Sequence, residues 1–209
     1  MKKVQVVFVL FLLAAIAAVA QTPCAPHPSD PSAVLIGSMT VTVEIAQSSS
    51  VSGKSGKKGT KCTVAQLICV WRTADGGVDL IGDPATVKLS GTCLTEIPTA
   101  DLFALLGQAA VAQAVGNGYI PCNTNCDGKT AARFLTVTCV NRTGSGSTTK
   151  FGPCTTVQCV RAYTVCCPSG PGSPKINRAP SSNDGCGTTP EGCQSACDQD
   201  CPPAGAVVE

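Results

Sequence analysis

The pattern of apolar and polar residues predicts that strands make up most of a domain at 33–167. Between residues 35 and 45, apolar side chains occupy every second position apart from Ile36 and Gly37, which is typical of a strand with one buried face. Residues 62–71 are apolar on both faces, so we expect this strand at the centre of the sheet. The residues between these two strands, 47–61, form a polar Ser/Gly/Lys loop.

Shorter strands are expected further along the chain. Asp75-Gly76-Gly77 marks a turn, and extended pieces follow at 78–81 and 86–89. Segments 132–141 and 155–167 each keep apolar residues on one face. The connection between these two segments is rich in Gly, Ser and Thr, so we expect an antiparallel hairpin with a long loop.

One helix is predicted, capped by Thr99 and stopped by Gly116, with Asp101 in its first turn where the helix dipole favours an acid. Helical spacing predicts a buried stripe made of Leu102, Leu105, Leu106, Ala109 and Ala112. The fold class expected is α+β, with a small antiparallel sheet of about four to five strands and one packed helix. Disulfides stiffen this fold, and extended arms leave it at both ends.

The first twenty residues, 1–20, have the pattern of a secretory signal peptide. Lys2 and Lys3 precede an apolar run that ends in Ala18-Val19-Ala20, so we expect cleavage before Gln21. A retained transmembrane helix is the alternative, but the run is short for a bilayer and ends in alanines instead of charges. The expected product is secreted or displayed at the cell surface, without integral insertion in a membrane.

The two ends of the mature chain differ in composition from the domain. Residues 21–32 hold four prolines, which predicts an extended arm. This arm either packs on the surface through Cys24 or reaches a neighbouring subunit. Residues 168–184 have the Pro/Gly/Ser composition of a linker, and the Cys-rich tail at 185–209 has almost nothing apolar to bury.

Cysteine is the most informative residue type, because 15 cysteines in an exported chain indicate a disulfide framework. Metal binding is the weaker alternative, since no C-x-x-C pair is present and there is one histidine. The odd count leaves at least one thiol outside internal pairs. Adjacent Cys166 and Cys167 are expected to bond to different partners. The candidates for disulfide formation are Cys24, Cys62, Cys69, Cys93, Cys122, Cys126, Cys139, Cys154, Cys159, Cys166, Cys167, Cys186, Cys193, Cys197 and Cys201.

The net charge of the chain argues against nucleic acid as a partner. The chain has a formal net charge of +2, and loss of Lys2 and Lys3 brings its 15 basic residues down to 13 against 13 acidic ones. A neutral surface does not steer a protein toward nucleic acid. Lys54, Lys57 and Lys58 form a local basic loop that could contact an anionic glycan, although such lysines more often keep an exposed loop soluble.

No catalytic motif is complete in this sequence. Gly53-Lys54-Ser55 lacks the glycine that a phosphate-binding loop requires at position 48, and Thr143 stands where a nucleophile elbow at Ser145 needs glycine. His27, the one histidine, lies in the proline-rich arm, where we expect no fixed geometry for a general base. A thiol–disulfide oxidoreductase is disfavoured because no cysteine lies in the first turn of the predicted helix. We therefore expect a non-enzymatic protein without a cofactor or a bound metal.

Two classes of function remain. The first is a structural subunit of an extracellular filament, sheath or matrix that associates with its own copies through the terminal arms. The second is a monomeric secreted binding or inhibitor module that uses the Ser/Gly/Lys loop as its contact surface. The oligomeric state of the native protein separates them.

Overall fold

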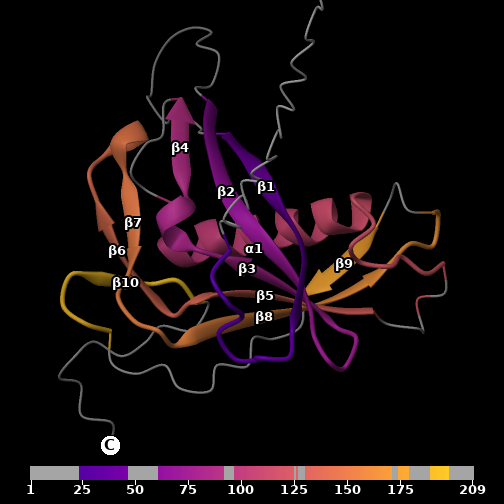
Figure 1. Cartoon of the computed structure of the whole chain (residues 1–209). Coiled ribbons are helices and arrows are strands. Elements are labelled where there is room, and N and C mark those ends of the chain that lie inside the picture. The colour runs from indigo at the N-terminus through magenta and orange to yellow at the C-terminus, as the bar shows by residue number, and fades with distance from the viewer. Residues whose placement is uncertain are drawn as a thin grey trace, which may run out of the picture.

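The computed structural model of the protein describes residues 24–46, 61–91, 97–124, 126, 130–170, 174–178 and 189–197. In these ranges a large curled sheet covers one helix, and a small sheet lies beside it (Figure 1). The elements are β1 (Val34–Ala46), β2 (Lys61–Arg72), β3 (Val78–Gly82), η1 (Pro84–Thr86), β4 (Lys88–Gly91), α1 (Thr99–Gly116), β5 (Thr130–Val137), β6 (Cys139–Thr143), η2 (Gly146–Thr148), β7 (Lys150–Pro153), β8 (Gln158–Cys166), β9 (Lys175–Arg178) and β10 (Cys193–Ser195).

The mixed α+β class with one helix is confirmed over the described ranges, but the sheet is larger than expected. It has seven strands in the order β1-β2-β3-β5-β8-β9, with β4 also paired to β2. The expectation of a purely antiparallel sheet is wrong, because β3 and β5 pair in parallel. Parallel neighbours need a crossover connection, and the chain between β3 and β5 includes α1, which supplies it.

The first two strands follow their sequence pattern. In β1, Met39 and Val41 are buried while Thr40 and Thr42 are exposed. The interruption at Ile36 coincides with a register shift in the pairing of β1 with β2. A bulge adds one residue and restores the alternation beyond it. β2 lies inside the sheet, as its two apolar faces predicted, and pairs with β1, β3 and β4.

The predicted hairpin is confirmed as a pairing but not as a simple connection. β5 pairs antiparallel with β8. The strand expected at 132–141 is divided between β5 and β6, and the connection expected as a loop at 142–153 holds the end of β6, η2 and β7. β6 and β7 form a three-stranded sheet with β10 in the order β10-β6-β7. This small sheet pairs β6 with β10, a segment about fifty residues further along the chain.

The helix has the predicted length but presents a different face. Thr99 is its first residue and does not cap it, because Pro98 occupies the N-cap and the Thr99 hydroxyl hydrogen-bonds to Oε1 of Gln194 on β10. Leu102 and Leu106 are buried as expected, and half-buried Ala109 packs against the core. Leu105 is 40% exposed, so its expected place in the core is wrong, and Ala112 is only half-buried. The buried residues are Thr99, Leu102, Phe103, Leu106, Gly107, Ala110, Val111, Ala114 and Val115.

Close packing explains this choice of face. A Cβ placed on Gly107 would lie 2.7 Å from Oη of Tyr163 and 2.9 Å from Cδ1 of Phe134. Since real Cβ atoms do not approach other heavy atoms so closely, glycine is required where α1 crosses β5 and β8. The large side chain of Phe103 lies one turn before this crossing and is fully buried.

Disulfides join segments that are far apart in the sequence. The five whose partners are described are Cys24–Cys69, Cys122–Cys167, Cys126–Cys166, Cys154–Cys193 and Cys159–Cys197. Cys62 is also disulfide-bonded. Adjacent Cys166 and Cys167 have different partners, as predicted. Within the described ranges Cys139 is the one free cysteine, whereas Cys93, Cys186 and Cys201 lie outside those ranges.

Candidate functional site

Residues 24–33, here called the N-terminal arm, lie against the outside of the large sheet. Cys24 is bonded to Cys69 of β2, with 5.7 Å between their Cα atoms. His27 is 8% exposed and meets the ring of Trp71 edge-on at a centroid distance of 5.7 Å. The expectation that this arm leaves His27 without fixed geometry is wrong.

A network of three side chains, two of them buried and the third partly exposed, holds the arm in place. Nε2 of His27 lies 2.9 Å from Oδ2 of Asp79, which is on β3. Arg133 of β5 donates to the same carboxylate, from Nε to Oδ1 at 2.7 Å and from Nη2 to Oδ2 at 2.8 Å. The hydrogen bond with Asp79 raises the pKa of Arg133. The Asp79 side chain is only 1% exposed, so its charge is compensated by these partners instead of by water.

The hydrogen bonds of His27 decide whether it can act as a base. Its Nδ1 accepts from the backbone N–H groups of Asp30 at 2.9 Å and Ser29 at 3.3 Å. An accepting Nδ1 carries no proton, so the proton of the neutral ring is on Nε2 and points to Asp79. A Ser–His–Asp arrangement needs the second nitrogen free for the nucleophile. Both nitrogens of His27 are engaged, and the residue therefore acts as a structural link.

Other carboxylates are used in local structure. Asp75 accepts from Thr73 Oγ1 at 2.5 Å and from the backbone of Gly77 at 3.2 Å, and these bonds lower its pKa. Asp83 accepts from the backbone of Ala85 at the start of η1. Asp101 lies exposed in the first turn of α1. The carboxylates of Glu96 and Asp127 lie outside the described residues.

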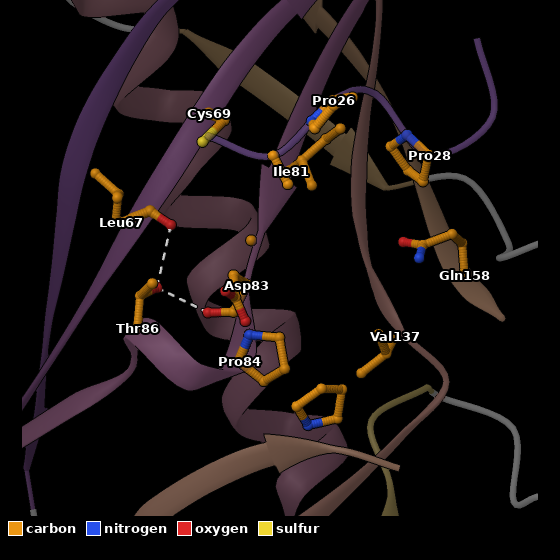
Figure 2. A pocket seen from close by; sticks show the side chains of 13 residues that line it. Pro26, Pro28, Leu67, Cys69, Ile81, Asp83, Pro84, Thr86, Val137 and Gln158 are labelled. Carbon is orange, nitrogen blue, oxygen red and sulfur yellow. Dashed lines mark hydrogen bonds between the residues drawn. The ribbon is translucent and has the colours of Figure 1, made fainter. Parts of the chain in front are cut away.

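A pocket of about 220 Å³ opens between the N-terminal arm and the sheet (Figure 2). The arm provides one wall, β2, β3 and η1 provide the floor, and residues from β5, β7 and β8 close the far side. Its lining residues are Ala25, Pro26, Pro28, Leu67, Cys69, Ile81, Gly82, Asp83, Pro84, Thr86, Val137, Pro153 and Gln158.

Several polar groups of this pocket are bonded within the protein. The Thr86 hydroxyl donates to the carbonyl of Asp83 at 2.7 Å and lies 3.4 Å from that of Leu67 (Figure 2). Gln158 donates through Nε2 to the carbonyl of Thr156 at 3.2 Å. An occupant would therefore meet proline rings and aliphatic side chains, which favours an apolar group.

Most of the predicted basic loop, including its three candidate lysines, lies outside the described residues. These lysines are Lys54, Lys57 and Lys58. Lys61 begins β2, and its Nζ lies 2.8 Å from Oε2 of Glu44 on β1. This exposed pair raises the pKa of Lys61 and lowers that of Glu44 through their shared hydrogen bond. Screening by water makes such surface pairs weak.

Across the described ranges, no three His, Cys, Asp or Glu side chains are grouped as ligands for a metal ion. In the same ranges, no helix has both the length and the apolarity needed to cross a bilayer.

Comparison of the chain with protein-family models, with curated proteins and with solved structures finds no match in any of the three. Function is therefore inferred from the geometry of this chain alone. The sequence pattern alone does not reveal the pocket, since its walls come from segments separated by more than a hundred residues.

Proposed function

We propose that the protein is a non-enzymatic binding module of the cell exterior, and that the pocket under the N-terminal arm is its binding site. The observation that carries this proposal is the fixed position of the pocket wall. A disulfide at Cys24, a buried hydrogen bond between His27 and Asp79 and the contact of the His27 ring with Trp71 all hold the arm. A wall that is fixed before binding loses little conformational entropy when a partner arrives.

The chemistry of the lining supports one class of occupant. The pocket is apolar, and about 150 Å³ is enough to hold a benzene ring in a protein interior. A volume of about 220 Å³ therefore fits a single aromatic group of the size of indole. The chemical class we propose is an uncharged aromatic group, either a small molecule or a side chain of a partner protein.

Saturation-transfer NMR with indole as the probe tests this proposal. Unmodified protein should transfer saturation to indole, and Ala25→Phe should abolish the transfer because the exposed Ala25 lines the pocket and the larger ring fills it. Ala74→Phe is the matched control, since Ala74 is exposed and does not line the pocket. Equal signals from the two variants, or no signal from the unmodified protein, would refute the binding site.

The alternative function is assembly into an extracellular structure, and the outer edge of β1 favours it. β1 is thirteen residues long and pairs with β2 on one side. On its other side Nε2 of Gln113 donates to the carbonyl of Thr40 at 3.1 Å. Alternate residues of an edge strand point their backbone groups outward, so those of Thr42 and Glu44 face the same open side. Such an edge can pair with a strand of another copy.

Sedimentation of the exported, oxidised chain separates the two functions. A binding module should sediment as a monomer at high concentration, whereas an assembly subunit should form larger species. If larger species appear, Thr42→Pro should remove them because proline deletes an outward N–H group, and Thr42→Ser should leave them intact. The described cysteines of both ends are bonded within the chain, which supports the monomeric binding module over the assembly subunit. These cysteines are Cys24, Cys193 and Cys197.

A further inference from the structure

The small sheet brings three sulfur atoms to one face. Cys139 begins β6, and its carbonyl accepts a hydrogen bond of 3.0 Å from the backbone of Cys154, which follows β7. On the other side of β6, Cys193 pairs with Asn141. Residues two apart on a strand share a face, and directly opposed residues share it too. The side chains of Cys139, Cys154 and Cys193 therefore lie on the same side of this sheet.

Two of these sulfurs are bonded to each other and the third is a thiol. The Cys154–Cys193 disulfide joins the ends of β7 and β10 across β6. Cys139 is free and only 1% exposed. Cross-strand neighbours that share such a hydrogen bond have Cα atoms about 5.5 Å apart. This separation lies within the range of about 4.4–6.8 Å in which two cysteines form a disulfide.

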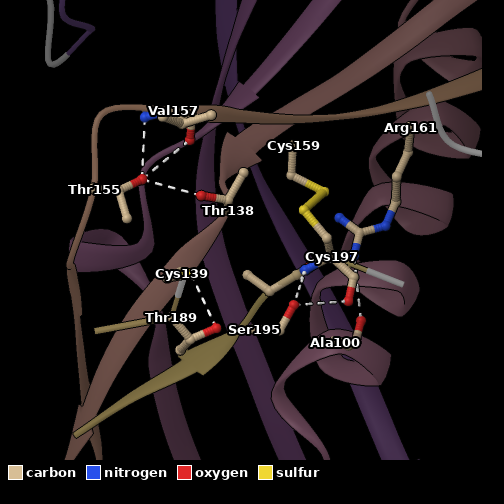
Figure 3. Close-up of a disulfide and its surroundings, with 11 residues drawn as sticks. Ala100, Thr138, Cys139, Thr155, Val157, Cys159, Arg161, Thr189, Ser195 and Cys197 are labelled. Atoms are coloured by element: carbon tan, nitrogen blue, oxygen red, sulfur yellow. Dashed lines mark hydrogen bonds between the residues drawn. A yellow bond between two sulfur atoms is a disulfide. The ribbon is translucent and has the colours of Figure 1, made fainter. Parts of the chain in front are cut away.

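The cover over Cys139 comes from the chain segment that the disulfide holds. Asn141 is exposed on the same face, so the face itself is turned toward solvent. Cys139 is buried beside Thr189, with 3.9 Å between Sγ and the Thr189 hydroxyl (Figure 3). Thr189 and Cys193 belong to residues 189–197, here called the C-terminal segment. Loosening of this segment would therefore expose the thiol and the disulfide together.

We propose that Cys139, Cys154 and Cys193 form a thiol–disulfide exchange site. The thiolate of Cys139 attacks Sγ of Cys154, so that a Cys139–Cys154 bond forms and the Cys154–Cys193 bond breaks. Cys193 leaves as a thiolate and takes up the proton that Cys139 released, so no external oxidant or reductant is consumed. This proposal is independent of the pocket and of the binding function.

The product of the exchange is a thiol at the surface. Cys193 is half-buried, whereas Cys139 is enclosed. The C-terminal segment stays attached after the exchange, because Cys197 remains bonded to Cys159 (Figure 3). The backbone of Ala196 also donates to the carbonyl of Thr138 at 2.8 Å. The exchange thus moves one thiol from the interior to a position where a disulfide of another protein can react with it.

Peptide mapping of the full-length oxidised protein tests the exchange. The protein is held at pH about 8, where part of a thiol is ionised, and samples are then quenched in acid and alkylated with N-ethylmaleimide in denaturant. Trypsin releases residues 134–142 with Cys139 as the one cysteine and residues 151–161 with Cys154 and Cys159. We expect the label on Cys139 to fall with time while label on Cys193 and a Cys139–Cys154 link rise by the same amount.

Two variants make the assignment specific. In Cys139→Ser the label on Cys193 should be lost, because the internal nucleophile is gone. In Cys193→Ser, treatment with glutathione disulfide should convert residues 134–142 from the alkylated form to the form linked to Cys154. Label that stays on Cys139 at every time point in the unmodified protein overturns the proposal, whatever the variants show. A bond from Cys139 to any cysteine other than Cys154 or Cys193 also overturns it.

Discussion

The N-terminal arm and the C-terminal segment meet the same physical problem in different ways. Neither has enough apolar residues to form its own core, and both must be held by the body of the protein. The arm uses one disulfide and buried polar side chains around Asp79. The segment uses two disulfides, at Cys193 and Cys197, together with backbone pairing to β6.

This difference between the two ends predicts which substitutions should loosen each of them. Removal of a single carboxylate should loosen the arm around His27, because Asp79 serves both His27 and Arg133, while the disulfide at Cys24 still tethers it. The segment should resist any single side-chain change but depend on its covalent bonds. It also meets a buried cation, Arg161, whose Nη2 donates to the carbonyl of Ala196. Burial lowers the pKa of Arg161 to about 10, and its Nη2 also lies 3.5 Å from the carbonyl of Ala100, so this cation joins the segment to the start of α1.

The largest effect should follow removal of both disulfides of the C-terminal segment. Each closes a loop of about forty residues, which corresponds to about 4 kcal/mol in the loop-closure treatment. Alanine at Cys154, Cys159, Cys193 and Cys197 should therefore lower the free energy of unfolding severely. Hydrogen exchange should show lost protection at the amide of Ala196, while the arm keeps its protection around His27.

The matching change at the arm should be milder in its local effect. In Cys24→Ala with Cys69→Ala, the His27–Asp79 contact remains, so the arm should stay protected from exchange below the unfolding transition. Loss of protection at the amide of Asp30 in this variant would show that the arm also depends on its covalent bond.

Another large effect should come from Asp79→Ala. This change leaves buried His27 without its acceptor and Arg133 without its partner, and breaking such a buried pair costs about 3 kcal/mol. Urea unfolding should measure this loss. Asp101→Asn is the control, since Asp101 is exposed in the first turn of α1 and should change stability little. A loss in the control as large as in Asp79→Ala would remove the special role of the network.

A smaller effect should follow Thr99→Val. The Thr99 hydroxyl joins the start of α1 to Gln194 of β10, and one such hydrogen bond contributes about 1 kcal/mol. Thermal unfolding should show a modest decrease, and Thr99→Ser should restore the original value because it keeps the hydroxyl. Equal stability of the valine and serine variants would mean that backbone pairing and disulfides alone position β10.

The smallest effect is a change in pH dependence at Asp30→Asn. The hydrogen bond with Ser32 lowers the pKa of Asp30 below its ordinary value of 3.8. A lowered pKa in the folded state stabilises the protein above pH 3.8, and this stabilisation is lost as the pH falls through the folded-state value. The variant should therefore lose less stability than the unmodified protein on acidification below pH 4, measured by urea unfolding at several pH values.

The spacing of apolar residues predicted the strands whose buried positions follow a regular pattern along a single segment. The alternation in β1 and the two apolar faces of β2 are visible in the sequence because each strand has one environment along its length. The helix was also predictable, but not its face, since Leu105 and Phe103 are both apolar at helical positions. Only the crossing at Gly107, beside Tyr163 and Phe134, decides which of them is buried.

Non-local pairing explains what the sequence could not reveal. β6 and β7 are four or five residues long, and their partner β10 has three, so none carries a strong period of its own. His27 and Asp79 are 52 positions apart, and no local rule joins a proline-rich arm to a carboxylate in a strand. The disulfides showed the same limit: the separate partners of Cys166 and Cys167 were predictable, but the identity of those partners was not.

The adjacent cysteines at the end of β8 also have a consequence for oxidative folding. Cys166 and Cys167 bond to Cys126 and Cys122, so an exchange of these partners would differ by a single position along the chain. A slip of β8 by one position would bring Cys167 to the place of Cys166 but carry Cys166 away from Cys122, so at most one of the two exchanged bonds could form. The same slip would turn Arg161 and Tyr163 away from the interior. A slipped chain would therefore keep unpaired thiols and an incomplete core, so the adjacent cysteines disfavour an error of one residue in the register of this strand.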